Sequence, residues 1–171
     1  MAIMRVNPTR MELSRLKKRL AVARRGHKLL KDKRDELMKK FLDLVRKNKI
    51  LREKVEDMLM KVHEDFLIAR AVMSSESLEG ALMFPKQDIS LDVSTQNIMS
   101  VYVPVLNYNM SSSDESDIYP YGFASTSGEL DGAIGTLAAA LPSMLELAQM
   151  EKSSQLLAQE IERTRRRVNA L

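Results

Sequence analysis

A heptad pattern between residues 13 and 62 limits, more than any other feature, what this sequence can fold into. One series of positions alternates there in steps of three and four residues, and its only polar members are His27, Arg34 and Asn48. A series sustained over about seven heptads is typical of the buried seam of a coiled coil. The apolar residues that we expect to form this seam are Leu13, Leu16, Leu20, Leu30, Leu37, Phe41, Leu44, Leu51 and Val55.

The helix that carries the seam is expected to run without a break from about residue 9 to residue 73. Pro8 suits a first helical turn, and Thr9 and Glu12 have the spacing of a capping box. Gly26 is the sole glycine before position 80, and no proline follows Pro8 until position 85. Such a helix is about 95–100 Å long, whereas a compact domain of this size is about 40 Å across. The sequence therefore predicts an elongated chain.

The polar members of the seam have structural explanations. Asn48 at a core position is expected to fix the register and the number of helices. Arg34 is expected to extend its charge outward past its aliphatic stem. His27 and His63 are separated by about 54 Å along a straight helix, so they cannot share a metal ion there, and we interpret each as a packing or surface residue.

A different pattern follows between residues 74 and 132. Alternating apolar residues at 88–106 predict a β-hairpin, with its turn in the polar stretch Ser94–Asn97. Pro104 is expected at an edge or bulge because it has no N–H to donate. Two strands alone are marginally stable, so the hairpin should pack against a helix or a partner. The alternating residues are Ile89, Leu91, Val93, Val101, Val103 and Val105.

After a polar connection at 109–128, a second long helix is expected over 129–171. Its apolar positions change phase near residues 145–150, which is typical of a stutter, and Pro142 either starts a new helix or kinks this one. One expected seam contains Ile134, Leu137, Leu141, Met144 and Ala148, and the next contains Met150, Leu157, Ile161, Val168 and Leu171. The predicted fold is mainly α, a long antiparallel two-helix coiled coil with a small β-hairpin inserted between the helices, forming one structural unit.

Charge is divided unevenly along the chain. Residues 1–70 carry 21 Lys/Arg and 10 Asp/Glu, a net +11, and residues 71–171 carry 6 and 13, a net −7. A basic cluster at 17–28 and the arginines at 163–167 should converge at one tip if the helices fold back on each other. A charge run is usually a solvated helix face, but two runs brought together favour a partner-binding surface.

Motifs for catalysis or cofactor binding are absent from the sequence. Gly128, Gly132 and Gly135 do not form the dinucleotide-binding pattern, and there is no Walker loop, nucleophile elbow or HExxH motif. The chain has no cysteine, which fits a reducing compartment, and no apolar run approaches the length of a membrane span. We therefore expect a cytoplasmic protein without catalysis, cofactor or metal.

Two segments carry a resemblance to a known family. NPTRMELSRLKKRLAVARRGHKLLKDKRDEL at 7–37 and RTRRRVNAL at 163–171 resemble the signature segments of the D-subunit of V-type and A-type rotary ATPases. NIMSVYVPVLNY at 97–108 and the segment that begins SGELDG at 127 also resemble it, especially its bacterial members. The resemblance covers essentially the whole chain in the same order. The family continues for several helical turns past VNAL, so we expect the chain to be truncated.

The resemblance implies a function and a set of partners. The D-subunit is the central rotor shaft, and its terminal end inserts into the bore of the catalytic A/B hexamer. The F-subunit packs against its middle, and its lower end engages the connector above the membrane ion ring, so the chain is expected in the soluble sector, peripheral to the membrane. We expect no direct membrane insertion, nucleic acid or nucleotide binding. The residues expected to contact the hexamer are Arg10, Lys17, Arg24, Arg165, Arg166 and Arg167, and the hairpin is assigned to the F-subunit or to regulation of ATPase activity.

Two other functions fit the residue pattern alone. A basic coiled coil that binds nucleic acid is favoured by the charge of residues 1–70, but acids along the same helix and the scarcity of aromatic residues count against it. A scaffold coiled coil would self-associate through its heptads. The transported ion and the direction of the reaction do not follow from this chain.

Overall fold

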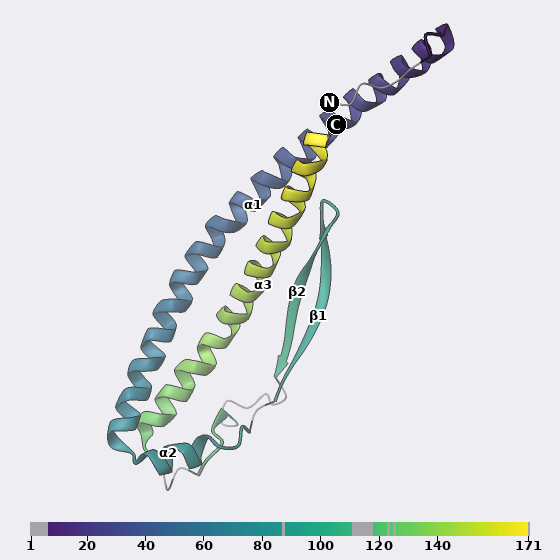
Figure 1. Cartoon of the computed structure of the whole chain (residues 1–171). Coiled ribbons are helices and arrows are strands. Elements are labelled where there is room, and N and C mark those ends of the chain that lie inside the picture. The colour runs from purple at the N-terminus through teal and green to yellow at the C-terminus, as the bar shows by residue number, and fades with distance from the viewer. Residues whose placement is uncertain (1–6, 87, 111–117, 123, 125, 171) are drawn as a thin grey trace. The chain divides into compact units, whose positions relative to one another are not determined.

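The computed structural model describes residues 7–86, 88–110, 118–122, 124 and 126–170. The helices and strands of this described part follow one another along the chain (Figure 1): α1 (Arg10–Val72), α2 (Ser75–Leu82), β1 (Ile89–Ile98), β2 (Val101–Met110) and α3 (Gly128–Ala170). The strands form a two-stranded antiparallel sheet. The mainly α fold with a hairpin between two long helices, which the sequence predicts, is confirmed.

Local signals set the start of α1 and create a short helix that the sequence pattern did not predict. The Thr9 hydroxyl accepts the backbone N–H of Glu12 at 3.3 Å, as expected for a helix N-cap. Ser74 does the same for α2, accepting the N–H of Ser77 at 3.3 Å. With Glu76 in its first turn, α2 carries the usual start signals. Its short sequence, SESLEGAL, has too few apolar residues for a helical period to be recognised.

The chain divides into two compact units, and both long helices contribute to each. The first unit contains Met1–Leu42 and Leu157–Leu171. In it α1 and α3 run antiparallel, and Leu37, Leu157 and Ile161 are buried. Beyond the end of α3, α1 continues alone in the described part of this unit (Figure 1). Two predicted seam residues there, Leu13 and Leu20, are exposed, because the described residues place no second helix opposite them.

The second unit contains Asp43–Leu156 and has its core between the remaining parts of the same two helices. On α1, Val55 and Val62 are buried. The α3 seam differs from the prediction: Ala133 and Ala140 are buried, whereas Leu137 and Met144 remain more than a third exposed. Pro142 lies inside α3, so it does not start a new helix. Small residues let the two helix backbones approach, which explains why alanine and not the larger neighbours occupies the seam.

Asn48 is the one strongly polar position within the α1 seam of the second unit. It is half-buried, and its Oδ1 atom is buried without a hydrogen-bond partner among the described residues. An unsatisfied buried acceptor costs roughly 1–3 kcal/mol relative to its solvated state. Asn48 therefore lowers the stability of the coil locally, and its role in fixing the register stays a prediction.

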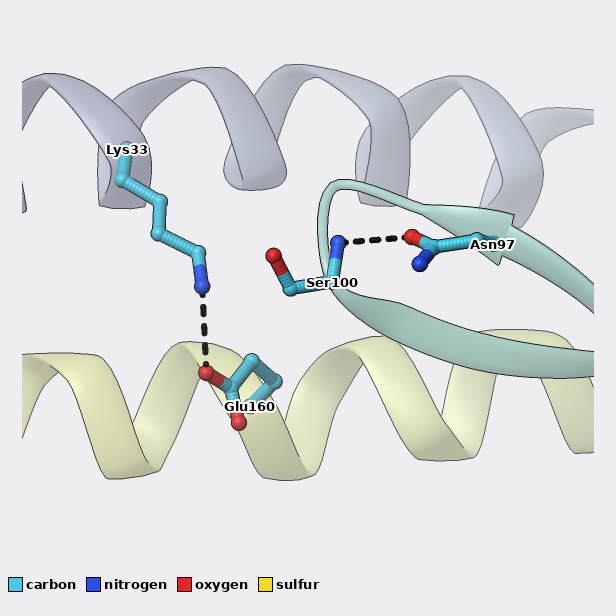
Figure 2. A network of polar contacts seen from close by, with 4 residues as sticks. All are labelled: Lys33, Asn97, Ser100 and Glu160. Atoms are coloured by element: carbon cyan, nitrogen blue, oxygen red, sulfur yellow. Dashed lines mark hydrogen bonds and ion pairs between the residues drawn. The ribbon is translucent and has the colours of Figure 1, made fainter.

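The hairpin turn lies later in the chain than the sequence predicted. Ser94–Asn97 belongs to β1, and the chain reverses at Met99 and Ser100. Both turn residues have positive φ, 52° and 72°, as in the type I′ turns that fit the twist of a two-residue hairpin. The N–H of Ser100 donates to Asn97 Oδ1 at 2.8 Å (Figure 2). Neither turn residue is glycine or asparagine, which concealed the turn in the sequence.

The predicted apolar residues of the two strands lie on opposite faces of the hairpin. Val101 and Val103 are buried, at 8% and 3% exposure, whereas Leu91 and Val93 are 45% and 62% exposed. Cross-strand partners share a face, and Val103 pairs with Gln96, not with an apolar residue of β1. The face that contains Val101 and Val103 therefore packs inward, and the face that contains Leu91 and Val93 lies outward.

Substituting Ser100 with Gly should stabilise the hairpin by about 0.5–1 kcal/mol, because glycine adopts positive φ without steric cost. Amide exchange of the β1–β2 ladder measures the effect. Ser100→Ala is the matched control: it keeps the N–H bond to Asn97 and the steric cost, and should not slow exchange. Equal exchange in both variants would show that the turn is not strained.

Candidate functional site

The C-terminal arginines lie on the exposed surface of the last turns of α3. Arg165, Arg166 and Arg167 are all exposed. Arg166 forms an ion pair with Glu162 at 3.3 Å within the helix. Arg165 lines a groove between α3 and α1 whose opposite wall includes Arg34 and Asp35. The end of α3 thus presents a cluster of solvated positive charge.

Two charged contacts organise the adjoining part of α1. Lys33 Nζ lies 3.4 Å from Glu160 Oε1 and joins the two helices across the first unit (Figure 2). Their side chains are only 29% and 18% exposed. Arg34 instead bonds to Asp35 Oδ1 through Nε at 2.9 Å and Nη2 at 2.6 Å. The Arg34 side chain is 30% exposed and lines the groove between α1 and α3, where its charge is paired with Asp35.

The structure does not bring all six predicted hexamer-contacting residues together. Arg10 and Lys17 precede Arg34 by 24 and 17 residues, which corresponds to about 36 Å and 26 Å along α1. Arg24 is about 15 Å away on the same scale. Among the described residues, Arg10 and Lys17 therefore lie at other levels along α1 than Arg165, and the hexamer contacts predicted for them stay a prediction.

The projecting part of α1 carries an apolar groove with a basic rim. Leu13, Leu16, Leu20 and Ala23 line it, together with Lys17 and Arg19. These residues continue the heptad seam of α1. Within the described residues no other helix lies over this groove.

A third surface, which the sequence pattern did not reveal, lies around α2 in the second unit. Its core consists of Ala69, Leu130 and Ile134, on which residues of α2 and of 118–121 pack. The Tyr121 hydroxyl donates to Asp131 Oδ1 at 2.7 Å. Burial, followed by this hydrogen bond and the charge of Asp131, raises the pKa of Tyr121, so the hydroxyl remains a donor at neutral pH.

Large apolar side chains are exposed around this core. Met83 and Phe84 are 67% and 75% exposed, and Leu67 is 65% exposed. Leu67 also lines a shallow groove with His63, Phe66, Arg70 and Leu78. Exposed apolar side chains of this size are candidates for contact with a partner. The signal in the sequence was the run Leu82–Phe84, which includes the end of α2.

Among the described residues, no group of three or more His, Cys, Asp or Glu side chains is arranged to hold a metal ion. His27 and His63 are both exposed. One α-helix, α3, is long and apolar enough to cross a membrane by length and composition alone, which the sequence pattern did not predict. This is weak evidence, because a core helix of a soluble protein passes the same test, and α3 contains much of the core described above.

The described residues form a mainly helical protein in which α1 packs on α3, a two-stranded hairpin lies between them in the chain, and basic and apolar side chains are exposed. The sequence matches the family described as the ATP synthase D-subunit over residues 12–171. The chain belongs to this family.

Curated relatives match the whole chain. The V-type ATP synthase D-subunit of Acetivibrio thermocellus is 86% identical over 171 residues, which cover all of this chain and 77% of that protein. The D-subunits of Clostridioides difficile and Clostridium novyi are 62% and 60% identical over all of this chain and over 77% and 80% of their own lengths. The resemblance of the sequence to this family is confirmed by these matches.

Substituting Glu160 with Gln should destabilise the first unit by about 0.5 kcal/mol, because it removes a partly buried ion pair between helices, within the small range measured for such pairs. Thermal unfolding at low and high salt measures the effect, which should shrink as salt rises. Glu162→Gln, which removes an exposed pair within one helix, is the matched control. If Glu162→Gln lowered the stability more than Glu160→Gln, the ion pair between the helices would not be the more stabilising of the two.

Proposed function

We propose that this chain is the central rotor shaft of a V-type or A-type rotary ATPase, transmitting torque between the ATP-hydrolysing A/B hexamer and the ion-translocating ring in the membrane. Membership of the D-subunit family over nearly the whole chain carries this proposal. In each unit α1 and α3 bury their seams against each other. Pairing of α1 with α3 within one chain suits a shaft that is present in a single copy.

The shaft has no catalytic role of its own in this proposal, and ATP is hydrolysed by its partners. The partners are the A and B subunits around the basic end of α3, the F-subunit beside the hairpin, and the connector against the surface around α2. The exposed apolar residues Leu67, Met83 and Phe84 support the last assignment, since they offer a surface for a stable contact. The chain then belongs to the soluble sector of the enzyme, peripheral to the membrane.

Solvated charges are suitable contacts for a rotating shaft. A shaft has to pass through several equivalent orientations, and deeply buried apolar anchors would hold one of them too firmly. Exposed ion pairs contribute only about 0–1 kcal/mol each and exchange readily. We propose that Arg165, Arg166 and Arg167 make such contacts with the hexamer, and that Arg10, Lys17 and Arg24 make further contacts at other levels along α1.

The arrangement of charge on α1 counts against nucleic-acid binding. Basic side chains form ion pairs with nearby acids of the same helix: Arg15 with Glu12, Lys39 with Glu36, Arg46 with Asp43 and Lys49 with Glu53. Such pairing weakens the continuous positive potential that phosphate binding requires. Burial of the seam within the chain likewise counts against a self-associating scaffold.

Replacing Arg165, Arg166 and Arg167 together with Ala should weaken binding to the A/B hexamer roughly tenfold at low salt, if each contact contributes about 0.5 kcal/mol. The dissociation constant is measured at several ionic strengths, and the difference from the parent chain should shrink as salt rises. The triple variant Lys39→Ala, Lys40→Ala and Lys47→Ala removes equal charge from α1 and is the control. Unchanged binding of the arginine variant at all ionic strengths would exclude these contacts.

Replacing Ile89, Leu91 and Val93 together with Thr should leave the coiled coil folded, because all three side chains are already exposed. If the outward hairpin face contacts the F-subunit or tunes turnover, the variant should weaken binding of the F-subunit or change the ATPase rate by severalfold. Helical circular dichroism serves as the folding control. A variant equal to the parent in both affinity and rate would remove the hairpin face from this role.

A further inference from the structure

The register of the hairpin shows which backbone groups of β1 lack a partner in β2. In a hairpin with a two-residue turn, the first pair after the turn is hydrogen-bonded, and from there bonded and non-bonded pairs alternate. Counting from the turn, the pairs Val93–Leu106 and Thr95–Pro104 are both non-bonded. The backbone polar groups of these four residues therefore point away from the neighbouring strand.

Two observations on β2 agree with this assignment. Pro104 has no N–H and is accommodated in a strand only where the N–H would face away from the ladder. The N–H of Leu106 donates to Gln149 Oε1 of α3 at 2.9 Å, so it is used outside the sheet. By the same alternation, the outward backbone groups of β1 belong to Ile89, Leu91, Val93, Thr95 and Asn97.

The two edges of the hairpin differ in how they are protected. The edge of β2 is interrupted by Pro104 and bonded to α3 through Gln149. The edge of β1 extends over ten residues that include no proline, lysine, arginine or glycine, and residues 89–97 are all exposed. Natural proteins usually protect such edges with proline, lysine or a bulge. An unprotected edge of this length is a template for another strand.

The side chains next to this edge are also suited to a partner. Leu91 and Val93 are exposed and share their face with Tyr102 and Tyr108 of β2, which are 67% and 36% exposed. A strand added to β1 would form main-chain hydrogen bonds with the edge and would also cover apolar side chains at alternate positions. Main-chain bonds supply affinity and alternate side-chain contacts supply specificity in this mode of recognition.

The size of the edge indicates what kind of strand occupies it. A ten-residue strand is about 33 Å long and a sheet layer is about 10 Å thick, so pairing two such edges buries roughly 700 Å² in total, below the ~1,200 Å² of a stable interface. Two copies of this chain would not hold together through β1 alone. A segment that other contacts of the same complex hold nearby would stay paired with β1. Asp92 is the one charged residue of β1, and it would favour a basic residue at its level on the added strand.

We propose that the edge of β1 accepts an extended segment of a neighbouring protein of the complex, apolar at alternate positions and carrying a lysine or arginine level with Asp92. This inference rests on the proposed function, which supplies the neighbouring proteins. It assigns the hairpin a mode of binding, strand addition, in which the backbone of β1 forms the contact.

Residue-resolved amide exchange tests this inference on the full chain, free and in the soluble complex reconstituted with the A, B and F subunits. The outward amides of Leu91, Val93 and Thr95 should exchange at least tenfold more slowly in the complex. The inward amides of Asp92 and Ser94 are already bonded to β2 and should change much less.

Val93→Pro removes one outward N–H and leaves the ladder intact, as Pro104 does on the other strand, and it should abolish the slowing at Leu91. Val93→Thr keeps the N–H and should retain the slowing.

The outcomes separate this inference from the proposed function. If the chain co-elutes with the hexamer but its outward amides exchange as in the free chain, strand addition is wrong and the rotor proposal stands. If the chain does not co-elute, the rotor proposal fails and this inference fails with it. Loss of slowing in both Val93 variants would show a side-chain contact without strand addition, and slowing in a dimer of the free chain would assign the edge to a second copy. Each of these last two results would overturn the proposal of strand addition by a neighbouring protein.

Discussion

Burial of one apolar seam between α1 and α3 is the interaction on which the rest of the structure depends. Full burial of a leucine or valine side chain contributes about 1.5–3 kcal/mol, whereas an exposed ion pair contributes about 0–1 kcal/mol. In the first unit Leu37 and Leu157 are completely buried, and in the second Val55 and Ala140 are buried. Ion pairs such as Lys33 with Glu160, and Arg52 with Glu151 at 2.7 Å, lie beside the seam. These ion pairs help to set the alignment of α1 and α3, while apolar burial supplies most of the stability.

The seam is buried within one chain from Leu37 to Val62, and other surfaces of the described residues remain exposed. The arginines of α3, the residues around α2 and the outward face of β1 differ in their chemistry. The arginines are solvated and suit a contact that is made and broken, whereas Met83 and Phe84 are apolar and suit a lasting one. The proposed shaft would need both kinds of contact.

The heptad series and the helix caps made much of the fold predictable. The period of apolar residues from Leu30 to Val62 specifies one buried face, and the spacing of Thr9 and Glu12 specifies where α1 begins. The turn at Met99 and Ser100 was not predictable from local preference, because cross-strand pairing forces non-glycine residues to positive φ. The α3 seam was predicted only in part, since close helix packing selects Ala133 and Ala140 over larger neighbours.

The candidate site was less predictable than the fold. The sequence singles out the arginines at 165–167 as a prediction, but a pattern of charges does not give the levels of Arg10 and Lys17 along the paired helices. The sequence pattern also grouped Leu91 and Val101 together as alternating apolar residues of the hairpin, and the register of the hairpin assigns them to opposite faces. Register and relative helix length are properties of paired elements, so neither can be obtained from one segment of sequence alone.

The measurement that tests the central claim most directly is ATP turnover by the purified A/B hexamer with and without this chain, combined with the number of copies of the chain that co-elute per hexamer. If the chain is the rotor shaft, one copy should co-elute per hexamer and the rate of turnover should change. Two or more copies per hexamer, or one copy that leaves turnover unchanged, would contradict the account.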